Sequence, residues 1–311
     1  MKPQLGAAFL AFSLLAGAAH AQGQASAQVS AAKPLSGERE RLGYMIGMDV
    51  GGDPAIQSAA PDIDMAAFEQ SVRRALAGQE STLRPEDAQA TSLALMQRVQ
   101  ARRAGTLDKA PAISRQHAGE LMGVTVGRSL ATIRADFDMA AFMRGLRVTL
   151  DKGKPLLSAE EADAIRQAFA ARQQQRAADT GEENRRAGEA FMAENRRTRG
   201  VITTRSGLQY QVIRPGTGAR PAPSARVRVD YEGRLLDGKV FDSSYQRGEP
   251  AQFALNQVIP GWTEGVGLMS VGAKYRFWVP GDLAYGRRGS PPTIGPNQTL
   301  VFDVELHEIL K

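Results

Sequence analysis

The C-terminal third of the chain concentrates aromatic residues at defined places in segments with the pattern of strands. They are Tyr231, Phe241, Phe253, Trp262, Tyr285 and Phe302. Around them the sequence has no cysteine, no Ser-His-Asp set and no spacing typical of metal ligands. An aromatic cup without a strong acid, base or nucleophile suits a reaction that needs shape and dryness. Rotation about a peptide bond to proline is such a reaction.

Four motifs follow one another in this region: VRVDYEGRLLDGKVFDSSYQRGEP, FALNQVIPGW, WVPGDLAYG and TLVFDVELHEI. Their types and order resemble the FKBP-type peptidyl-prolyl cis-trans isomerases, in particular the secreted bacterial branch of the macrophage infectivity potentiator and FkpA type. The resemblance covers residues 200–311 and implies an isomerase domain in which an antiparallel sheet wraps a short helix. It implies no cofactor and no metal ion.

The resemblance also implies which side chains form the site. The catalytic set is Asp242, Tyr285, Trp262, Phe241 and Phe302. The substrate-binding set is Tyr231, Arg247, Phe253, Val258, Ile259 and Ile294. In an unrelated sequence the same aromatics would be interpreted as core packing, and the family match is what favours a pocket for this subset.

Individual roles follow from the same resemblance. The indole of Trp262 would form the pocket floor, and the backbone N–H of Ile259 would point at a substrate carbonyl. The hydroxyl of Tyr285 would bind another carbonyl. Asp242 would lie at the edge, close enough to Arg247 to pair with it; the alternative is that its carboxylate caps the Asp-Ser-Ser turn.

The chain departs from the family pattern in two places. Ala251 stands where members often carry a pocket aromatic, although Phe253 lies two residues on. Ser290 and Thr293 occupy the loop after Tyr285, where larger side chains are common. These departures predict a pocket that is wider on one side, with catalysis retained. The resemblance implies macrolide inhibitors as ligands, and the two departures leave the affinity for them open.

The N-terminus has the layout of a secretory signal peptide. A charged start is followed by an apolar run, Leu5 to Ala19, and then by the A-x-A site Ala19-His20-Ala21. We expect residues 1–21 to be cleaved and the protein to be periplasmic or secreted; a retained membrane anchor is the alternative. Residues 22–37 are small and polar, which predicts a disordered tether. No second apolar run of that length follows, so we expect a soluble mature protein without stable membrane insertion.

Residues 38–157 contain a helical unit that occurs twice. DIDMAAF begins at Asp62 and DFDMAAF at Asp136, an offset of 74 residues, and apolar positions after each fall on one helical face. Asp64 and Asp138 are natural helix N-caps. Pro85 opens the next helix in the first copy, as Ser158 with Glu161 does in the second. A tandem duplication explains this pattern.

A ladder of glycines four residues apart precedes each copy. The ladders are Gly43, Gly47 and Gly51, and Gly119, Gly123 and Gly127. Glycine in a helix costs roughly 1 kcal/mol against alanine, so a repeated stripe indicates close helix contact; a frayed helix start is the alternative. In the resembling family one such unit per chain intertwines with a partner, which implies a homodimer. Two units per chain leave open that the copies pack within one chain.

Residues 158–199 predict a long exposed linker helix, weakened at Thr180-Gly181 and at Gly188, with a floppy charged linker as the alternative. Beyond Gly200, residues 208–212 and 227–231 alternate as half-buried strands. Residues 273–279 and 299–309 are predicted to be further strands, and a short helix fits between Pro260 and Met269. The predicted fold class is therefore α+β. The alternation of side chains along residues 273–279 places Trp278 on the opposite face from Tyr275 and Phe277. There it would be either exposed or covered by the helical part.

These observations predict an isomerase that assists the folding of exported proteins and also binds them as a chaperone. Its partners would be unfolded or proline-containing polypeptides. A holdase chaperone with weak or no isomerase activity is the alternative. The net charge of +6 is mild for 311 residues, and both signs are interleaved on predicted helices. We therefore expect no nucleic-acid partner.

Overall fold

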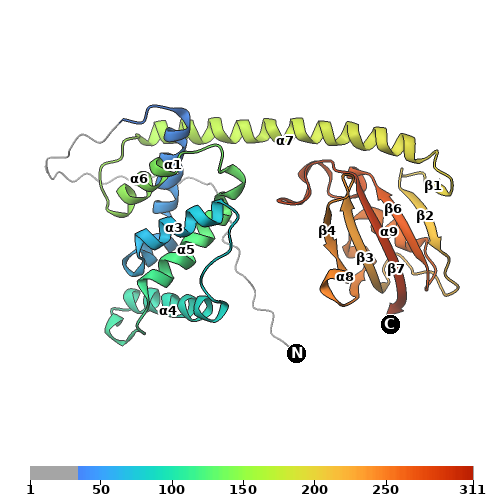
Figure 1. Cartoon of the computed structure of the whole chain (residues 1–311), viewed down its shortest axis with the longest axis horizontal. Coiled ribbons are helices and arrows are strands. Elements are labelled where there is room, and N and C mark those ends of the chain that lie inside the picture. Colours follow the sequence, from blue (N-terminus) through green and yellow to red (C-terminus); the bar gives the residue numbers. More distant parts are fainter. Residues whose placement is uncertain (1–33, 311) are drawn as a thin grey trace. The chain divides into compact units, whose positions relative to one another are not determined.

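The computed structural model describes residues 34–310. The predicted signal peptide and most of the predicted tether lie outside the described residues. Figure 1 shows a set of helices, then one long helix, then a β-sheet domain. No helix within residues 34–310 is long and apolar enough to cross a membrane.

The N-terminal helices follow the duplicated pattern. They are α1 (Glu38–Gly52), α2 (Pro54–Ala59), α3 (Met65–Leu76), α4 (Pro85–Arg103), α5 (Arg115–Leu130) and α6 (Met139–Leu150). The carboxylate of Asp64 accepts from two backbone N–H groups at the start of α3, and that of Asp138 accepts from one at the start of α6. Pro85 is the first residue of α4. The predicted caps are thus confirmed.

The two copies exchange helices within one chain. Helix α1, before the first DMAAF segment, packs on α6 of the second copy, while α5 packs on α3 of the first. The N–H of Asp138 donates to the carbonyl of Arg39 at 2.9 Å, and the N–H of Asp64 donates to that of Arg115 at the same distance. Each contact therefore occurs twice with the copies interchanged, as in an isologous interface.

Side-chain contacts repeat in the same way. The guanidinium of Arg102 pairs with Asp62 at 2.7 Å, and 74 residues later that of Arg176 pairs with Asp136 at 2.7 Å. Asp62 is almost fully buried, and burial alone would raise its pKa, but the guanidinium groups of Arg102 and Arg98 hold it below the usual value. Helix α4 is thus the counterpart in the first copy of the first turns of α7 (Ala159–Asn195).

The glycine ladders are the points of closest approach between exchanged helices. A Cβ atom on Gly47 would lie 2.0 Å from the carbonyl oxygen of Phe142, and one on Gly123 would lie 2.5 Å from that of Phe68. Both distances are far below van der Waals contact, so only glycine allows these crossings. The close-contact interpretation is confirmed, and the alternative of a frayed start is wrong, because the first ladder lies inside α1 and the second inside α5.

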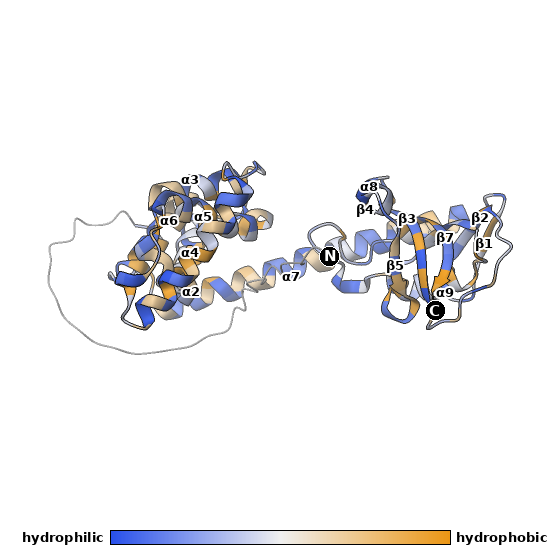
Figure 2. Ribbon diagram, turned by 90° about the horizontal axis from the view of Figure 1, so that it is seen from below, coloured by the Kyte–Doolittle hydropathy of each residue, from blue (hydrophilic) through white to orange (hydrophobic). Residues whose placement is uncertain are grey.

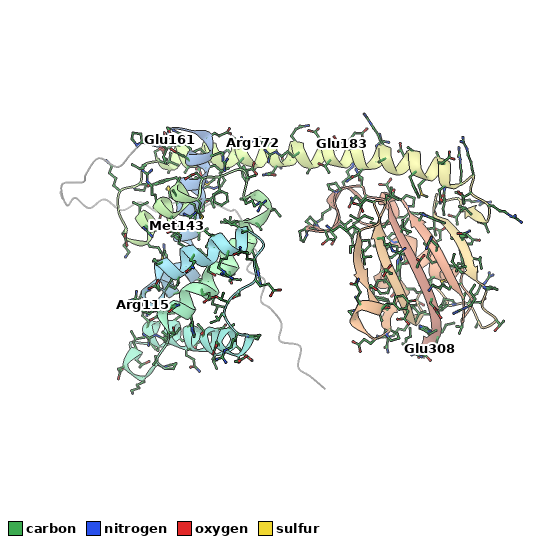
Figure 3. The ribbon with its side chains drawn as sticks, in the orientation of Figure 1. Arg115, Met143, Glu161, Arg172, Glu183 and Glu308 are labelled. Atoms are coloured by element: carbon green, nitrogen blue, oxygen red, sulfur yellow. The ribbon has the colours of Figure 1, made fainter. Side chains whose placement is uncertain are left out.

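The linker is one continuous helix. Ser158 caps α7 by accepting from the N–H of Glu161, whose carboxylate accepts in return from the N–H of Ser158 at 2.9 Å. Glu161 and Glu183 are labelled on α7 in Figure 3. The predicted weakening at Gly181 and Gly188 is wrong. The helix passes through both without interruption, and both are buried.

The C-terminal domain is a seven-stranded antiparallel sheet with two short helices. Its strands are β1 (Val201–Thr203), β2 (Gln209–Arg214), β3 (Arg226–Leu235), β4 (Val240–Ser243), β5 (Ala251–Ala254), β6 (Lys274–Val279) and β7 (Leu300–Leu310), with helices α8 (Ser244–Arg247) and α9 (Pro260–Gly267). The strand order is β1-β2-β6-β7-β3-β4, and β5 pairs with β3. The predicted α+β class is confirmed, whereas β1, β4 and β5 were not predicted.

Alternation along β3 places the core of this domain on one face of the sheet. Val227, Val229 and Tyr231 are buried there, and α9 packs on them through Trp262 and Val266. Figure 2 shows hydrophilic and hydrophobic residues together on the strands, as expected when one face is covered.

Trp278 lies outside this core but is only 7% exposed. Its partner in the β2–β6 register is Gln209, which donates to the carbonyl of Met192 on α7 at 2.8 Å. The end of α7 therefore covers this face of the sheet. The alternative of an exposed Trp278 is wrong.

The ladder geometry predicts opposite effects for two alanine substitutions in α1. Gly47→Ala should destabilise the helical half by about 1–3 kcal/mol, because the new methyl group overlaps backbone atoms of α6. Gly52→Ala is the matched control, since no atom lies within 4 Å of its Cβ position. This control should be neutral or stabilising by at most about 1 kcal/mol. Thermal unfolding of both variants tests this, and equal midpoints would contradict the close contact.

Candidate functional site

Trp262 is the centre of an aromatic cluster. It follows Pro260, which begins α9 and suits the first helical position. Its ring centroid lies 5.1 Å from Tyr231, 5.4 Å from Phe253 and 5.4 Å from Phe302, with interplanar angles of 83–89°. These are edge-to-face contacts, the arrangement that aromatic quadrupoles favour. Strands β3, β5 and β7 thus each contribute one ring around the indole.

Phe241 and Ile294 extend the cluster on either side. Phe241 meets Phe302 edge-on at 5.6 Å, and Ile294 is 5% exposed in the loop before β7. A Cβ atom on Gly233 of β3 would lie 2.6 Å from the ring of Phe241, so glycine at this position admits the ring. Gly233 was not among the predicted site residues.

A polar edge borders the cluster. The carboxylate of Asp242 accepts from the hydroxyl of Tyr231 and from the guanidinium of Arg247. Arg247 also donates to the Tyr231 hydroxyl at 3.0 Å and lies 5.4 Å from the centre of its ring. Ser243, not Asp242, caps α8. The alternative of Asp242 as a turn cap is therefore wrong.

Tyrosine hydroxyls at the site remain protonated well above neutral pH. Burial of Tyr231, together with its hydrogen bond to Asp242, raises its pKa to about 12. Partial burial of Tyr285 and the charge of Asp242 also raise the pKa of Tyr285. Both groups can act as hydrogen-bond donors, and neither is poised to lose a proton near pH 7.

Two hydrogen-bond donors of the predicted site are open. Within residues 34–310, neither the N–H of Ile259 nor the hydroxyl of Tyr285 donates to a protein acceptor. Tyr285 is 41% exposed, and Ile259 lies at the start of α9. The arrangement can therefore donate hydrogen bonds to the carbonyl groups of a polypeptide that is bound next to an apolar floor.

Ser244, Asp230 and His307 meet behind the cup, a cluster that the sequence analysis did not anticipate. The hydroxyl of Ser244 donates to Asp230 at 2.6 Å, and a ring nitrogen of His307 lies 2.7 Å from the other oxygen of that carboxylate. Asp230 stands between the other two, whereas nucleophilic catalysis needs histidine in that place. Ser244 is fully buried and accepts from the N–H of Tyr231 at 2.9 Å. The cluster therefore fixes the strand that carries Tyr231.

Comparison with models of protein families identifies the family of this chain. Residues 218–307 match the model described as FKBP-type peptidyl-prolyl cis-trans isomerase. Residues 39–120 and 115–212 each match the model of the domain amino terminal to these isomerases. The chain belongs to the FKBP-type peptidyl-prolyl cis-trans isomerases. Each copy of the duplicated helical unit is thus separately matched as an N-terminal domain of this family.

Similar proteins agree with this assignment. The chain is 43% identical to a probable FKBP-type isomerase FkpA of Neisseria meningitidis, over 62% of this chain and 74% of that protein. It is 42% identical to FkpA of Aeromonas hydrophila, over 63% and 76%. It is 37% identical to the outer membrane protein MIP of Legionella longbeachae, over 61% and 83%. The predicted family and its FkpA and MIP branch are confirmed, and the chain is a peptidyl-prolyl cis-trans isomerase.

The structure brings the predicted site residues of this FKBP-type isomerase into one contiguous set, apart from Tyr285, which is linked to them through the charge of Asp242. The aromatic members are linked by ring contacts, and Asp242 and Arg247 are linked to them through Tyr231. Val258 and Ile259 pack on the same core as Ile294. Phe253 on β5 reaches the indole, while Ala251, on the same strand, packs only partly buried against this core. Their individual roles in binding and catalysis stay predictions.

Substitutions should distinguish the contributions of the Tyr285 hydroxyl and the Asp242 carboxylate to activity. Tyr285→Phe deletes one hydroxyl, and a neutral hydrogen bond is worth about 0.5–1.5 kcal/mol, so kcat/KM should fall about threefold to tenfold. Asp242→Leu also releases Arg247 and the Tyr231 hydroxyl. Hydrogen bonds to charged groups are worth about 1.5–3 kcal/mol, so its loss should be about tenfold to a hundredfold.

Glu249→Gln is the matched control for Asp242, because its exposed carboxylate lies in the next loop. Its activity with short prolyl peptides should equal that of the wild type. A smaller loss for Asp242→Leu than for Tyr285→Phe would contradict the role given to the ion pair.

Proposed function

We propose that the aromatic cup around Trp262 binds a prolyl residue of an unfolded or partly folded polypeptide and catalyses its cis-trans isomerisation. The observation that carries this proposal is the set of edge-on rings next to two open donors, Ile259 N–H and the Tyr285 hydroxyl. Rings hold the pyrrolidine, and donors hold the carbonyls on either side of it.

The chemistry needs no proton transfer. Rotation about a prolyl bond has a barrier of about 18–20 kcal/mol, because amide resonance is lost in the twisted state. The planar amide is more polar than the twisted one, so a dry cup disfavours the ground state relative to the transition state. Donors placed in advance hold the rotating carbonyl. An acceleration of about 10⁵ requires about 7 kcal/mol.

A protease-coupled assay of a short prolyl peptide on the whole mature chain tests this function. We expect kcat/KM to stay within about twofold from pH 6 to pH 9, since both site tyrosines have raised pKa values and neither titrates in this range. A steep change with a midpoint near neutrality would show that an acid or base takes part. Activity at the uncatalysed rate would refute the function.

A holdase chaperone with weak or no isomerase activity is the second candidate, and holding and isomerisation are compatible in one chain. The long exposed surface of α7 and the helical region support client binding. Suppression of aggregation of an unfolded protein, measured for the wild type and for Asp242→Leu, distinguishes the two. Equal protection by both indicates holding that is independent of the site.

Export is part of this proposal. The signal-peptide pattern of residues 1–21 supports cleavage after Ala21 and a periplasmic or secreted protein. One similar protein is named an outer membrane protein. The clients would then be exported polypeptides. Mass spectrometry of the protein from its native cells should find Gln22 as the first residue, and a chain that begins at Met1 would contradict export.

The homodimer, in which the helical copies would exchange between chains, stays a prediction. Reciprocal packing of α1 on α6 and of α3 on α5 supports the alternative in which one chain satisfies both copies. On that basis light scattering of residues 22–311 should give the mass of one chain at micromolar concentration. A mass of two chains would instead support the predicted homodimer.

A further inference from the structure

Helix α7 touches the isomerase domain through one narrow stripe. Beyond its first turn the buried residues of this helix are Gly181 and Gly188. A Cβ atom on Gly188 would lie 2.3 Å from the hydroxyl oxygen of Thr299, and one on Gly181 would lie 3.1 Å from Pro296. Glycine is less favourable than alanine in an isolated helix. Here it permits the helix backbone to approach the loop before β7.

Asn184 lies on the same stripe, between the two glycines. Its side-chain amide donates to the carbonyl of Pro296 at 2.8 Å. In the opposite direction, the side-chain amide of Asn297 donates to the carbonyl of Gly181 at 3.1 Å. Two consecutive loop residues are therefore tied to one turn of α7 by reciprocal hydrogen bonds.

The tie is local. A cavity of about 330 Å³ lies between the C-terminal part of α7 and the domain, and Met192, Gln209 and Pro280 are among the residues that line it. Beside this cavity, α7 contacts the sheet through Gln209, whose side-chain amide bonds to Met192 and Asn195. The reciprocal amide bonds and the two glycine contacts carry most of the connection to the loop.

The same loop forms one side of the predicted pocket. Ser290 and Ile294 exchange backbone hydrogen bonds of 2.8 and 3.0 Å, which close the loop around the buried Ile294 side chain. The N–H of Asn297 donates to the carbonyl of Gly286 at 2.8 Å, and Gly286 follows Tyr285 directly. Asn297 thus contacts α7 through its side chain and the Tyr285 segment through its backbone.

Asn297 has a left-handed backbone conformation, with φ of 54°. Asparagine tolerates this conformation better than most residues. In this one conformation, Asn297 reaches α7 with its side-chain amide and Gly286 with its backbone N–H.

We propose that Asn184 and Asn297 form a clamp by which α7 positions the pocket wall at Ile294 and the Tyr285 segment. Both are positioning residues, because they act on the substrate through the loop. The proposal rests on the proposed function in one respect, the roles of Ile294 and Tyr285. Asn184 lies outside residues 218–307, so an isomerase domain considered alone would not contain the clamp.

The test uses Asn184 variants in the whole mature chain. Asn184→Ala removes the donor and keeps a good helix former. Asn184→Asp is nearly isosteric but cannot donate, and it places an acceptor against the carbonyl of Pro296. The matched control is Glu183→Ala, since Glu183 is the adjacent, exposed residue labelled on α7 in Figure 3.

Two readouts are needed. The first is kcat/KM for two peptides with a small and a large residue before proline. For Asn184→Ala we expect about a threefold loss with the small residue and a changed ratio between the peptides, because the wall is less fixed. Asn184→Asp should lose at least as much, and Glu183→Ala should behave as the wild type.

The second readout is hydrogen exchange of the amides of residues 286–299, which does not depend on activity. Exchange there should be faster in Asn184→Ala than in Glu183→Ala, and Asn297→Gly should reproduce the effect while it preserves the left-handed conformation. Unchanged exchange in both clamp variants would overturn the proposal. Faster exchange with an unchanged peptide ratio would reduce the clamp to a structural contact. Wild-type inactivity with faster exchange would refute the proposed function and leave the clamp in place.

Discussion

The edge-on contact of three rings with one indole is the constraint on which the isomerase domain depends. Trp262 joins α9 to β3, β5 and β7 at a single point. Such close approach requires small residues around the helix. A Cβ atom on Gly261 would lie 2.4 Å from the Val279 side chain, and one on Gly265 would lie 2.7 Å from the Phe277 ring. The cup is therefore inseparable from the packing of the helix on the sheet.

This arrangement has an energetic cost at its centre. The indole nitrogen of Trp262 is buried and has no hydrogen-bond acceptor within residues 34–310. An unsatisfied buried donor costs about 1–3 kcal/mol. A phenylalanine would avoid this cost but would present a smaller surface to the three rings. The domain thus tolerates an unpaired polar atom at the site where the largest flat apolar floor is formed.

Elements and residues with strong local signals were predictable from the sequence. The two Asp N-caps, the Ser158 capping box and the alternation along β3 each depend on short-range geometry, and each was found where predicted. Contacts between segments far apart in sequence were not predictable from local patterns, and the pocket was predicted only through the family resemblance. Exchange of α1 onto α6 depends on three-dimensional pairing, and short strands such as β4 lack enough residues for a periodic signal. The Asp230 cluster was missed because its members come from three different elements.

Glycines inside helices show why a residue type alone does not decide an interpretation. Gly181 and Gly188 were interpreted as weak points of α7 by their intrinsic propensity, whereas the ladders of α1 and α5 were interpreted as contact points by their spacing. Positions seven residues apart lie on nearly the same face of a helix, so spacing favoured a contact in α7 as well. Helix propensity describes the stability that an isolated helix loses when it contains glycine. A glycine that faces a neighbouring backbone also allows a close approach that a side chain would prevent. The spacing of helical glycines is therefore better evidence for a partner surface than their number is for flexibility.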